Sequence, residues 1–214
     1  MGSGVCYEDT MTEVQDETEG DTPLDLIESR ILEATIELAV AGGYEAVRQR
    51  DVAARAKVAL ATVYARFASK DILLGAALEL DSRRWLPELH ELPLRGRTPL
   101  ARVTKLFEHM TALWVRRPQL ARAALRAATS GDHEAMLRQM VAQQRIHVVI
   151  VDALRGPRAA PAMRREPALR VATVLTMVWF ANLTAWAAGI IDEAIVVDIV
   201  RQSADMLLHG VQPQ

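Results

Sequence analysis

The stretch that decides the fold covers residues 48–70 and reads RQRDVAARAKVALATVYARFASK. Its apolar residues recur at three- and four-residue steps, which is typical of helices with one buried face. The positions predicted to face the core are Val52, Ala53, Ala56, Val58, Val63 and Phe67. We therefore predict one short helix over residues 48–56 and a second over residues 59–67. Two short helices joined by a few residues, after a longer helix, are typical of a helix-turn-helix unit.

The exposed face of the second short helix mixes small apolar groups with hydrogen-bond donors. Its members are Leu60, Ala61, Thr62, Tyr64 and Arg66. A helix that enters the DNA major groove needs such a face, and Thr62, Tyr64 and Lys70 are placed to bond phosphate oxygens at the groove edges. The pattern predicts DNA binding, and a small helical subdomain that binds no nucleic acid is the alternative.

The run from residue 30 to residue 74 resembles the DNA-binding domain of the TetR family of bacterial repressors. The resemblance rests on GYEA at 43–46, RDVA at 50–53 and TVYARFASK at 62–70. It implies an all-helical homodimer with a small N-terminal helix-turn-helix domain and a larger C-terminal domain for ligand binding and dimerisation. It also implies that Thr62, Tyr64 and Lys70 contact phosphates or bases.

Three positions depart from the family's usual pattern. Lys57 stands at the turn where the family usually has glycine, and a positive φ there costs a non-glycine residue on the order of 1 kcal/mol. Arg48 and Ala59 replace the usual hydroxyl residues at the starts of the two short helices, and the absence of each cap costs about 1 kcal/mol. Arg48 and Lys57 are nevertheless expected to reach DNA phosphates.

Charge is distributed unevenly along the chain. The whole chain has a formal charge of -2, whereas residues 1–29 carry nine acidic side chains and no Lys or Arg. We expect residues 1–21 to be a disordered acidic tail, either simply solvated or competing with DNA phosphates for a basic face. The predicted domains are this tail, a DNA-binding domain over residues 22–74, and a ligand-binding and dimerisation domain over residues 75–214.

Helix start and stop signals place the other elements. Thr22 and Pro23 are predicted to begin the first helix, and the glycine pair at 42–43 is predicted to end it. Further helices are expected over residues 69–80, 98–117, 118–129, 132–154, 167–189 and 192–210, with no strand. The sequence thus predicts an all-α protein.

Residues 171–191 contain no charged side chain. The stretch is long enough to span a bilayer, but its threonines, its asparagine and its many alanines make insertion weak. We therefore predict a helix buried in a soluble core. The family resemblance implies that this helix and the last one pair with their copies in a four-helix dimer interface.

Large apolar and isolated polar residues on the middle helices are the candidates for a ligand cavity. They are Phe107, Met110, Thr111, Trp114, Leu125, Met136, Met140, His147, Trp179, Asn182 and Trp186. Such a lining suits a mostly hydrophobic ligand, although any single Trp or Met at helical spacing is more often a core residue than a pocket residue. Asn182 is the most informative, because an amide within an uncharged helix needs a partner.

Two segments are similar to the actinobacterial KstR-type repressors of cholesterol catabolism. They read GGYEAV at 42–47 and VWFANLTAW at 178–186. This resemblance implies an effector derived from a sterol.

Several functional classes find no support in the sequence. The lone cysteine, Cys6, falls in the acidic tail, no glycine-rich phosphate loop is present, and the five histidines are scattered. We expect no enzyme, catalytic residue, cofactor or metal. The expected partners are operator DNA, a hydrophobic effector and a second copy of the chain, in the cytoplasm and without a membrane. A DNA-independent helical module for a small molecule or a protein is the alternative function.

Overall fold

The computed structural model describes residues 25–94, 96–157 and 162–210, and within these ranges the chain forms helices and connecting turns but no strand. The helices are α2 (Leu26–Ala46), α3 (Gln49–Ala56), α4 (Leu60–Arg66), α5 (Lys70–Glu91), α6 (Pro99–Val115), α7 (Pro118–Ala128), α8 (His133–Arg155), α9 (Arg165–Ala187) and α10 (Glu193–Gly210). The all-α prediction is confirmed. The predicted acidic tail lies outside the described residues.

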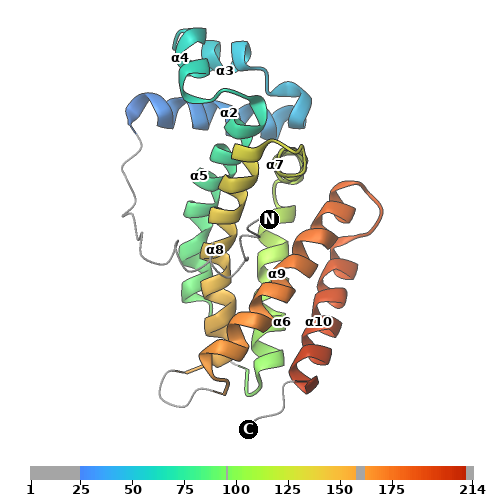
Figure 1. Ribbon diagram of the computed structural model, residues 1–214. Helices are drawn as coiled ribbons and strands as arrows, with labels where there is room; N and C mark the ends of the chain where they lie inside the picture. The colour runs from blue at the N-terminus through green and yellow to red at the C-terminus, as the bar shows by residue number, and fades with distance from the viewer. Residues whose placement is uncertain (1–24, 95, 158–161, 211–214) are drawn as a thin grey trace, which may run out of the picture.

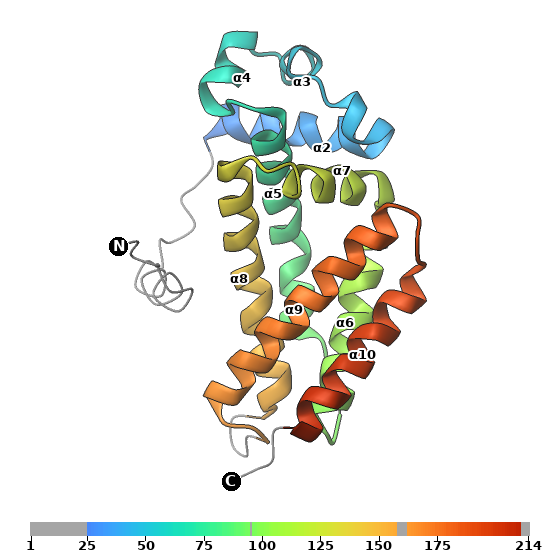
Figure 2. The same ribbon diagram turned by 45° about the vertical axis from the view of Figure 1, so that its right-hand side comes forward.

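The helices form a small head on a longer bundle (Figure 1). α2, α3 and α4 make the head at one end, and α5, α6, α8, α9 and α10 run away from it. α7 lies across the bundle, directly beneath α2. Figure 2 shows α9 and α10 side by side, running diagonally across the front of the bundle below the head.

Four helix starts in the bundle follow the predicted caps, whereas α9 begins at Arg165, two residues before the predicted Pro167. The cap side chains accept backbone N–H bonds at 3.1 Å for Ser69, 3.2 Å for Thr98, 3.1 Å for Asp132 and 2.9 Å for Asp192. The predicted start at Thr22 and Pro23 is wrong, because α2 begins at Leu26 and the Asp25 carboxylate accepts from the N–H of Glu28 at 2.7 Å. Thr22 and Pro23 themselves lie outside the described residues.

The glycine pair at the end of α2 interrupts the helix as predicted. Gly43 has a φ of 65° and a ψ of -156°, a conformation that only glycine adopts easily. A short further turn reaches Ala46, and Val47 then enters the core fully buried.

Two clusters of buried apolar residues stabilise the fold, and they share helices. The head cluster includes Ile31, Val52, Val63 and Phe67, but α7 and α8 also contribute to it, through Leu120, Ala123, Ala127 and Ala135. α5 begins in the head cluster and ends in the bundle cluster. The predicted boundary between residues 74 and 75 therefore falls inside one continuous helix.

α9 is long and apolar enough, by length and composition, to cross a membrane. In this structure one side of it packs in the bundle core, through Ala168, Val171, Leu175 and Leu183 among others. The prediction that every face of this helix is buried is wrong, because the side chains of Val174 and Met177 are 41% and 53% exposed. α9 thus has one buried face and one apolar exposed face.

Candidate functional site

The head presents α4 as an exposed helix over a closed core. Val63 and Phe67 are buried against α2 and α3, as the spacing predicts. The opposite face leaves Leu60 and Tyr64 41% and 52% exposed, with Ala61 exposed beside them. A short helix with a firmly packed inner face and small, mixed outer side chains is suited to entering a DNA groove.

The turn between α3 and α4 contains the expected left-handed residue. Lys57 has a φ of 55° and a ψ of 47°, and its side chain is exposed. Arg30 on α2 donates to the carbonyl oxygen of Lys57 at 3.0 Å and also to that of Ala56. Arg30 thereby holds the turn that orients α4, a role that sequence reasoning missed because its partners are backbone atoms.

Arg48 and Ala59 begin the two short helices without a side-chain cap, as their residue types predict. Arg48 is exposed and Thr62 is half-buried. Arg66 points back to the start of α2, where it pairs with Asp25 at 2.6 Å and lies 3.8 Å from Glu28. Of these predicted contacts, Arg48 is open to DNA, whereas Arg66 is already engaged by two carboxylates.

Lys70 is held at the junction of head and bundle. Its Nζ lies 3.8 Å from the ring centroid of Tyr44, and burial lowers the pKa of this amine. The Arg126 guanidinium, from α7, lies 4.0 Å from the same ring. Burial and the hydrogen bond that the Tyr44 hydroxyl donates to Asp71, at 2.7 Å, raise the pKa of Tyr44 to about 12.

Most of the predicted cavity residues lie in the closed bundle core. The buried ones are Phe107, Met110, Thr111, Trp114, Leu125, Trp179 and Trp186. The Trp179 ring contacts those of Phe107 and Trp114 at centroid distances of 5.9 and 5.8 Å. Asn182 is half-buried and donates to Val178 O within its own helix, and Met136 is exposed. The roles of these residues in ligand binding stay predictions.

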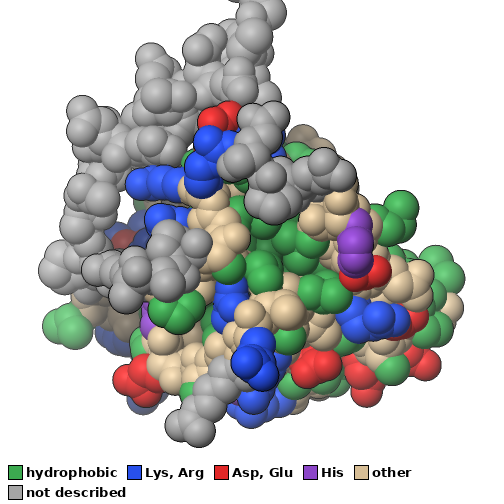
Figure 3. Space-filling view, turned by 90° about the horizontal axis from the view of Figure 1, so that it is seen from below, with side chains coloured by type: hydrophobic (Ala, Val, Ile, Leu, Met, Phe, Trp, Pro, Cys, Tyr) green, Lys and Arg blue, Asp and Glu red, His purple; other side chains and the backbone are tan. Residues whose placement is uncertain are grey.

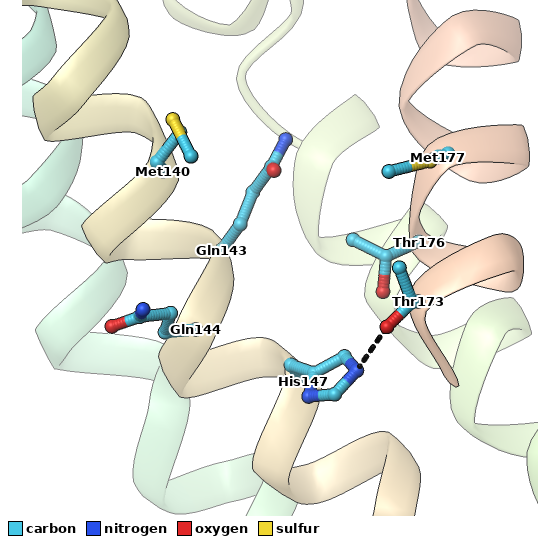
Figure 4. Close-up of a pocket in the computed structure, with 7 residues that line it drawn as sticks. All are labelled: Met140, Gln143, Gln144, His147, Thr173, Thr176 and Met177. Carbon is cyan, nitrogen blue, oxygen red and sulfur yellow. Dashed lines mark hydrogen bonds between the residues drawn. The ribbon is translucent and has the colours of Figure 1, made fainter. Parts of the chain in front are cut away.

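Met140 and His147 do line a cavity, which lies between α8 and α9 (Figure 4). Its volume is about 50 Å³, and its other lining residues are Gln143, Gln144, Thr173, Thr176 and Met177. The two glutamines were missed, although steps of three and four residues from Met140 to His147 put all four side chains on one face of α8.

His147 closes one side of this cavity. Its Nε2 lies 3.1 Å from Thr173 Oγ1 and 3.3 Å from Leu169 O. Burial lowers the pKa of His147, which favours the neutral form of the ring. The cavity lining thus combines this imidazole with two methionine, two threonine and two glutamine side chains.

A second cavity of about 300 Å³ lies on the other side of His147, towards the end of the bundle away from the head. It is lined by His147, Val148, Val151, Asp152, Arg155, Gly156, Arg165 and Leu169. The Nε of Arg155 is buried and has no hydrogen-bond partner among the described residues. Figure 3 looks at this end of the molecule and shows hydrophobic side chains surrounded by basic, acidic and histidine side chains.

Comparison with family models matches both parts of the chain. Residues 31–77 match the model of bacterial regulatory proteins of the tetR family, and residues 96–207 match that of the tetracyclin repressor-like C-terminal domain. These ranges correspond to the head with the first part of α5 and to the bundle from α6 onwards.

A curated relative supports the same family assignment. The HTH-type transcriptional repressor KstR of Rhodococcus jostii is 35% identical over 184 residues, covering 84% of this chain and 81% of that protein.

Solved structures share the fold. A TetR transcriptional regulator from Rhodococcus sp. RHA1 has a TM-score of 0.72 at 23% identity, covering 87% of this chain and 97% of that one. Thermus thermophilus FadR, solved with lauroyl-CoA, has a TM-score of 0.67 at 20% identity, covering 87% of this chain and 96% of that one. The chain belongs to the TetR family of bacterial transcriptional regulators and is similar to its KstR-type repressors.

Proposed function

We propose that this protein is a ligand-responsive transcriptional repressor that binds a palindromic operator as a homodimer and is released by a mostly hydrophobic small molecule. The observation that carries the proposal is the exposed outer face of α4, with Leu60 and Tyr64 open to solvent over a buried Val63. The match of residues 31–77 to the tetR-family model favours DNA over a protein partner as what this face contacts. Family membership likewise favours a regulator over an enzyme.

The DNA contacts divide into two groups by chemistry. Arg48, Lys57, Tyr64 and Lys70 would bind phosphate oxygens, which fixes the register of the head on the duplex. Leu60 and Ala61 would touch base edges, where small apolar groups favour the methyl group of thymine. Thr62 would donate or accept a hydrogen bond at the groove. Arg66 would reach DNA only after leaving Asp25.

The homodimer would form along α9 and α10. The exposed apolar side chains along these helices are Val174 on α9 and Ile195 and Met206 on α10. Pairing with a second copy removes this surface from water. A two-fold axis along these helices would present two heads to half-sites about 34–36 Å apart.

The effector would bind between α8 and α9. The cavity at Met140 and His147 holds about 50 Å³, whereas sites for drug-sized ligands hold about 300–1,000 Å³. The ligand must therefore displace His147 and join the two cavities. Its apolar part would lie against Met140 and Met177, and a polar or anionic end would meet Arg155 and Arg165.

The relatives offer probes for this site. Thermus thermophilus FadR was solved with lauroyl-CoA, which combines an apolar chain with an anionic end. The KstR resemblance favours a sterol-derived compound. The protein would act in the cytoplasm without a cofactor.

The test is fluorescence anisotropy of labelled DNA from upstream of the protein's own gene, against a scrambled duplex. We expect tight binding with dimer stoichiometry to the upstream DNA, and release by a sterol acid, a fatty acyl compound or lauroyl-CoA. Equal, weak binding to both duplexes at physiological salt would contradict the repressor assignment. Release by polar metabolites alone would contradict the hydrophobic effector.

A further inference from the structure

Two helix caps, 63 residues apart, are bonded to each other at the junction of head and bundle. Ser69 is the N-cap of α5 and accepts from the N–H of Ile72 at 3.1 Å, while its hydroxyl donates to Asp132 Oδ2 at 2.8 Å. Asp132 is the N-cap of α8, and its other oxygen accepts from the N–H of Ala135 at 3.1 Å. One oxygen of the Asp132 carboxylate thus caps its own helix, α8, and the other binds Ser69 at the start of α5, next to the head.

The head side of this bond lies next to DNA-contacting groups. Ser69 directly precedes Lys70 and comes two residues after Phe67, the buried C-cap residue of α4. A displacement of Ser69 therefore moves both the Lys70 backbone and the end of α4. Since phosphate contacts depend on the position of the cation, the anchorage of Ser69 affects DNA binding.

The bundle side of the bond leads to the effector cavity. Asp132 begins the helix that carries Met140, Gln143 and His147 into the cavity. A helix advances about 1.5 Å per residue and transmits displacement along its axis, so Asp132 lies only about 12 Å from Met140. The same rigid element therefore reaches from the cavity wall to the cap of α5.

A second contact from the bundle reaches the aromatic ring against which the Lys70 side chain lies. Arg126 on α7 stacks on the Tyr44 ring that Lys70 also contacts, and it pairs with Glu45 at 2.8 Å. The backbone of Lys70 is thus tied to α8, and its side chain shares a ring with α7.

We propose that Asp132, although it belongs to the effector-binding bundle, is a positioning residue for DNA binding that holds Lys70 and the end of α4 through Ser69. The inference rests on the proposed DNA binding and adds the route by which α8 controls it. An effector that shifts α8 farther than the Ser69–Asp132 hydrogen bond can stretch has one of two effects. Such a shift either moves Ser69 together with Asp132 or breaks the bond. Both outcomes displace Lys70.

The test compares three variants of the full chain. Asp132→Ser keeps one oxygen for the α8 cap and removes the one that binds Ser69. Asp132→Asn serves as the rescue, because its oxygen can cap α8 while its NH2 group donates to Ser69 Oγ, which restores the contact with the direction of the bond reversed. Asp192→Ser is the matched control, because Asp192 caps α10 with a bond to Ile195 N at 2.9 Å at the far edge of the bundle.

The first readout is binding to a random-sequence duplex from about 50 to 200 mM salt, where phosphate contacts set both affinity and salt slope. We expect Asp132→Ser to weaken binding about fivefold at low salt and to reduce the salt slope by about 0.9 for each phosphate that the head no longer binds. A purely structural loss of stability would leave the slope unchanged. Asp132→Asn and Asp192→Ser should match the wild type.

The second readout is amide hydrogen exchange without DNA. Asp132→Ser should speed exchange in the first turn of α5, residues 70–74, and Asp192→Ser should not. Equal exchange in these two variants, or an unchanged salt slope in Asp132→Ser, would overturn the inference. A wild-type protein that fails to bind duplex DNA at low salt would instead overturn the proposed function, while the exchange result would still decide whether Asp132 holds the head.

Discussion

The indole nitrogen of Trp179 donates a hydrogen bond to Thr111 Oγ1 at 3.0 Å, and both side chains are buried in the bundle core. The bond joins α6 to α9 within a cluster of aromatic rings. It gives a buried N–H its partner, whereas the Nε1 of neighbouring Trp114 has none among the described residues.

Removing the acceptor of this bond should destabilise the bundle. We expect Thr111→Val to lower the free energy of unfolding by about 1–3 kcal/mol, because the Trp179 N–H is left buried and unpaired. Urea denaturation measures the change. Thr111→Ser keeps the hydroxyl and should cost less, and an equal loss in both variants would point to packing instead.

Substitution of Lys57, the left-handed residue of the turn, by glycine should change the stability of the fold and the affinity for DNA in opposite directions. Lys57→Gly is expected to raise the free energy of unfolding by about 1 kcal/mol, because glycine adopts a φ of 55° without strain. The same change removes a cation and should weaken DNA binding. Lys57→Ala loses the cation but keeps the strain, so it should weaken binding without stabilising the fold.

Tyr64 should contribute to binding of all DNA sequences alike. We expect Tyr64→Ala to weaken binding to specific and random duplexes by the same factor, since a phosphate contact carries no sequence information. Tyr64→Phe keeps the exposed ring and removes only the hydroxyl, which isolates the hydrogen bond. Anisotropy titrations at two salt concentrations measure both effects, and a change in sequence preference would mean that Tyr64 reads bases.

His147 should make stability fall as pH falls below about 6.5. Burial lowers the pKa of this histidine in the folded state, so the unfolded chain binds the proton more tightly. The stabilisation is therefore fully present above the unfolded pKa and is lost as pH falls towards the folded one. Urea denaturation at pH 7.5 and 5.5 should show a smaller loss in His147→Gln than in the wild type.

Arg155 should select the polar end of the effector. We expect Arg155→Gln to weaken the response to anionic hydrophobic probes such as lauroyl-CoA, while DNA binding without a ligand stays unchanged. Arg170→Gln is the matched control, because Arg170 pairs with Glu166 in its own helix outside both cavities. A similar loss of response in the two variants would remove Arg155 from the site.

The fold was largely predictable because its signals are local. Ser69, Thr98 and Asp132 are capping residues followed by periodic apolar positions, and each begins a helix as predicted. The cavity was harder to predict, because periodicity tells which residues are buried but not which empty spaces they leave. Phe107 and Trp179 show the difference: they are buried as expected, yet they fill the core by contacting each other.

The shared helix α5 constrains how this scaffold can be re-engineered. A chimera joined between residues 74 and 75 would splice two unrelated halves within one helix, and it would also mismatch Leu120 and Ala123, which complete the core of the head. Recombination of whole heads between relatives is therefore a poor route to new operator specificity. Substituting the outward-facing residues of α4, beginning with Leu60 and Ala61, leaves every buried contact in place.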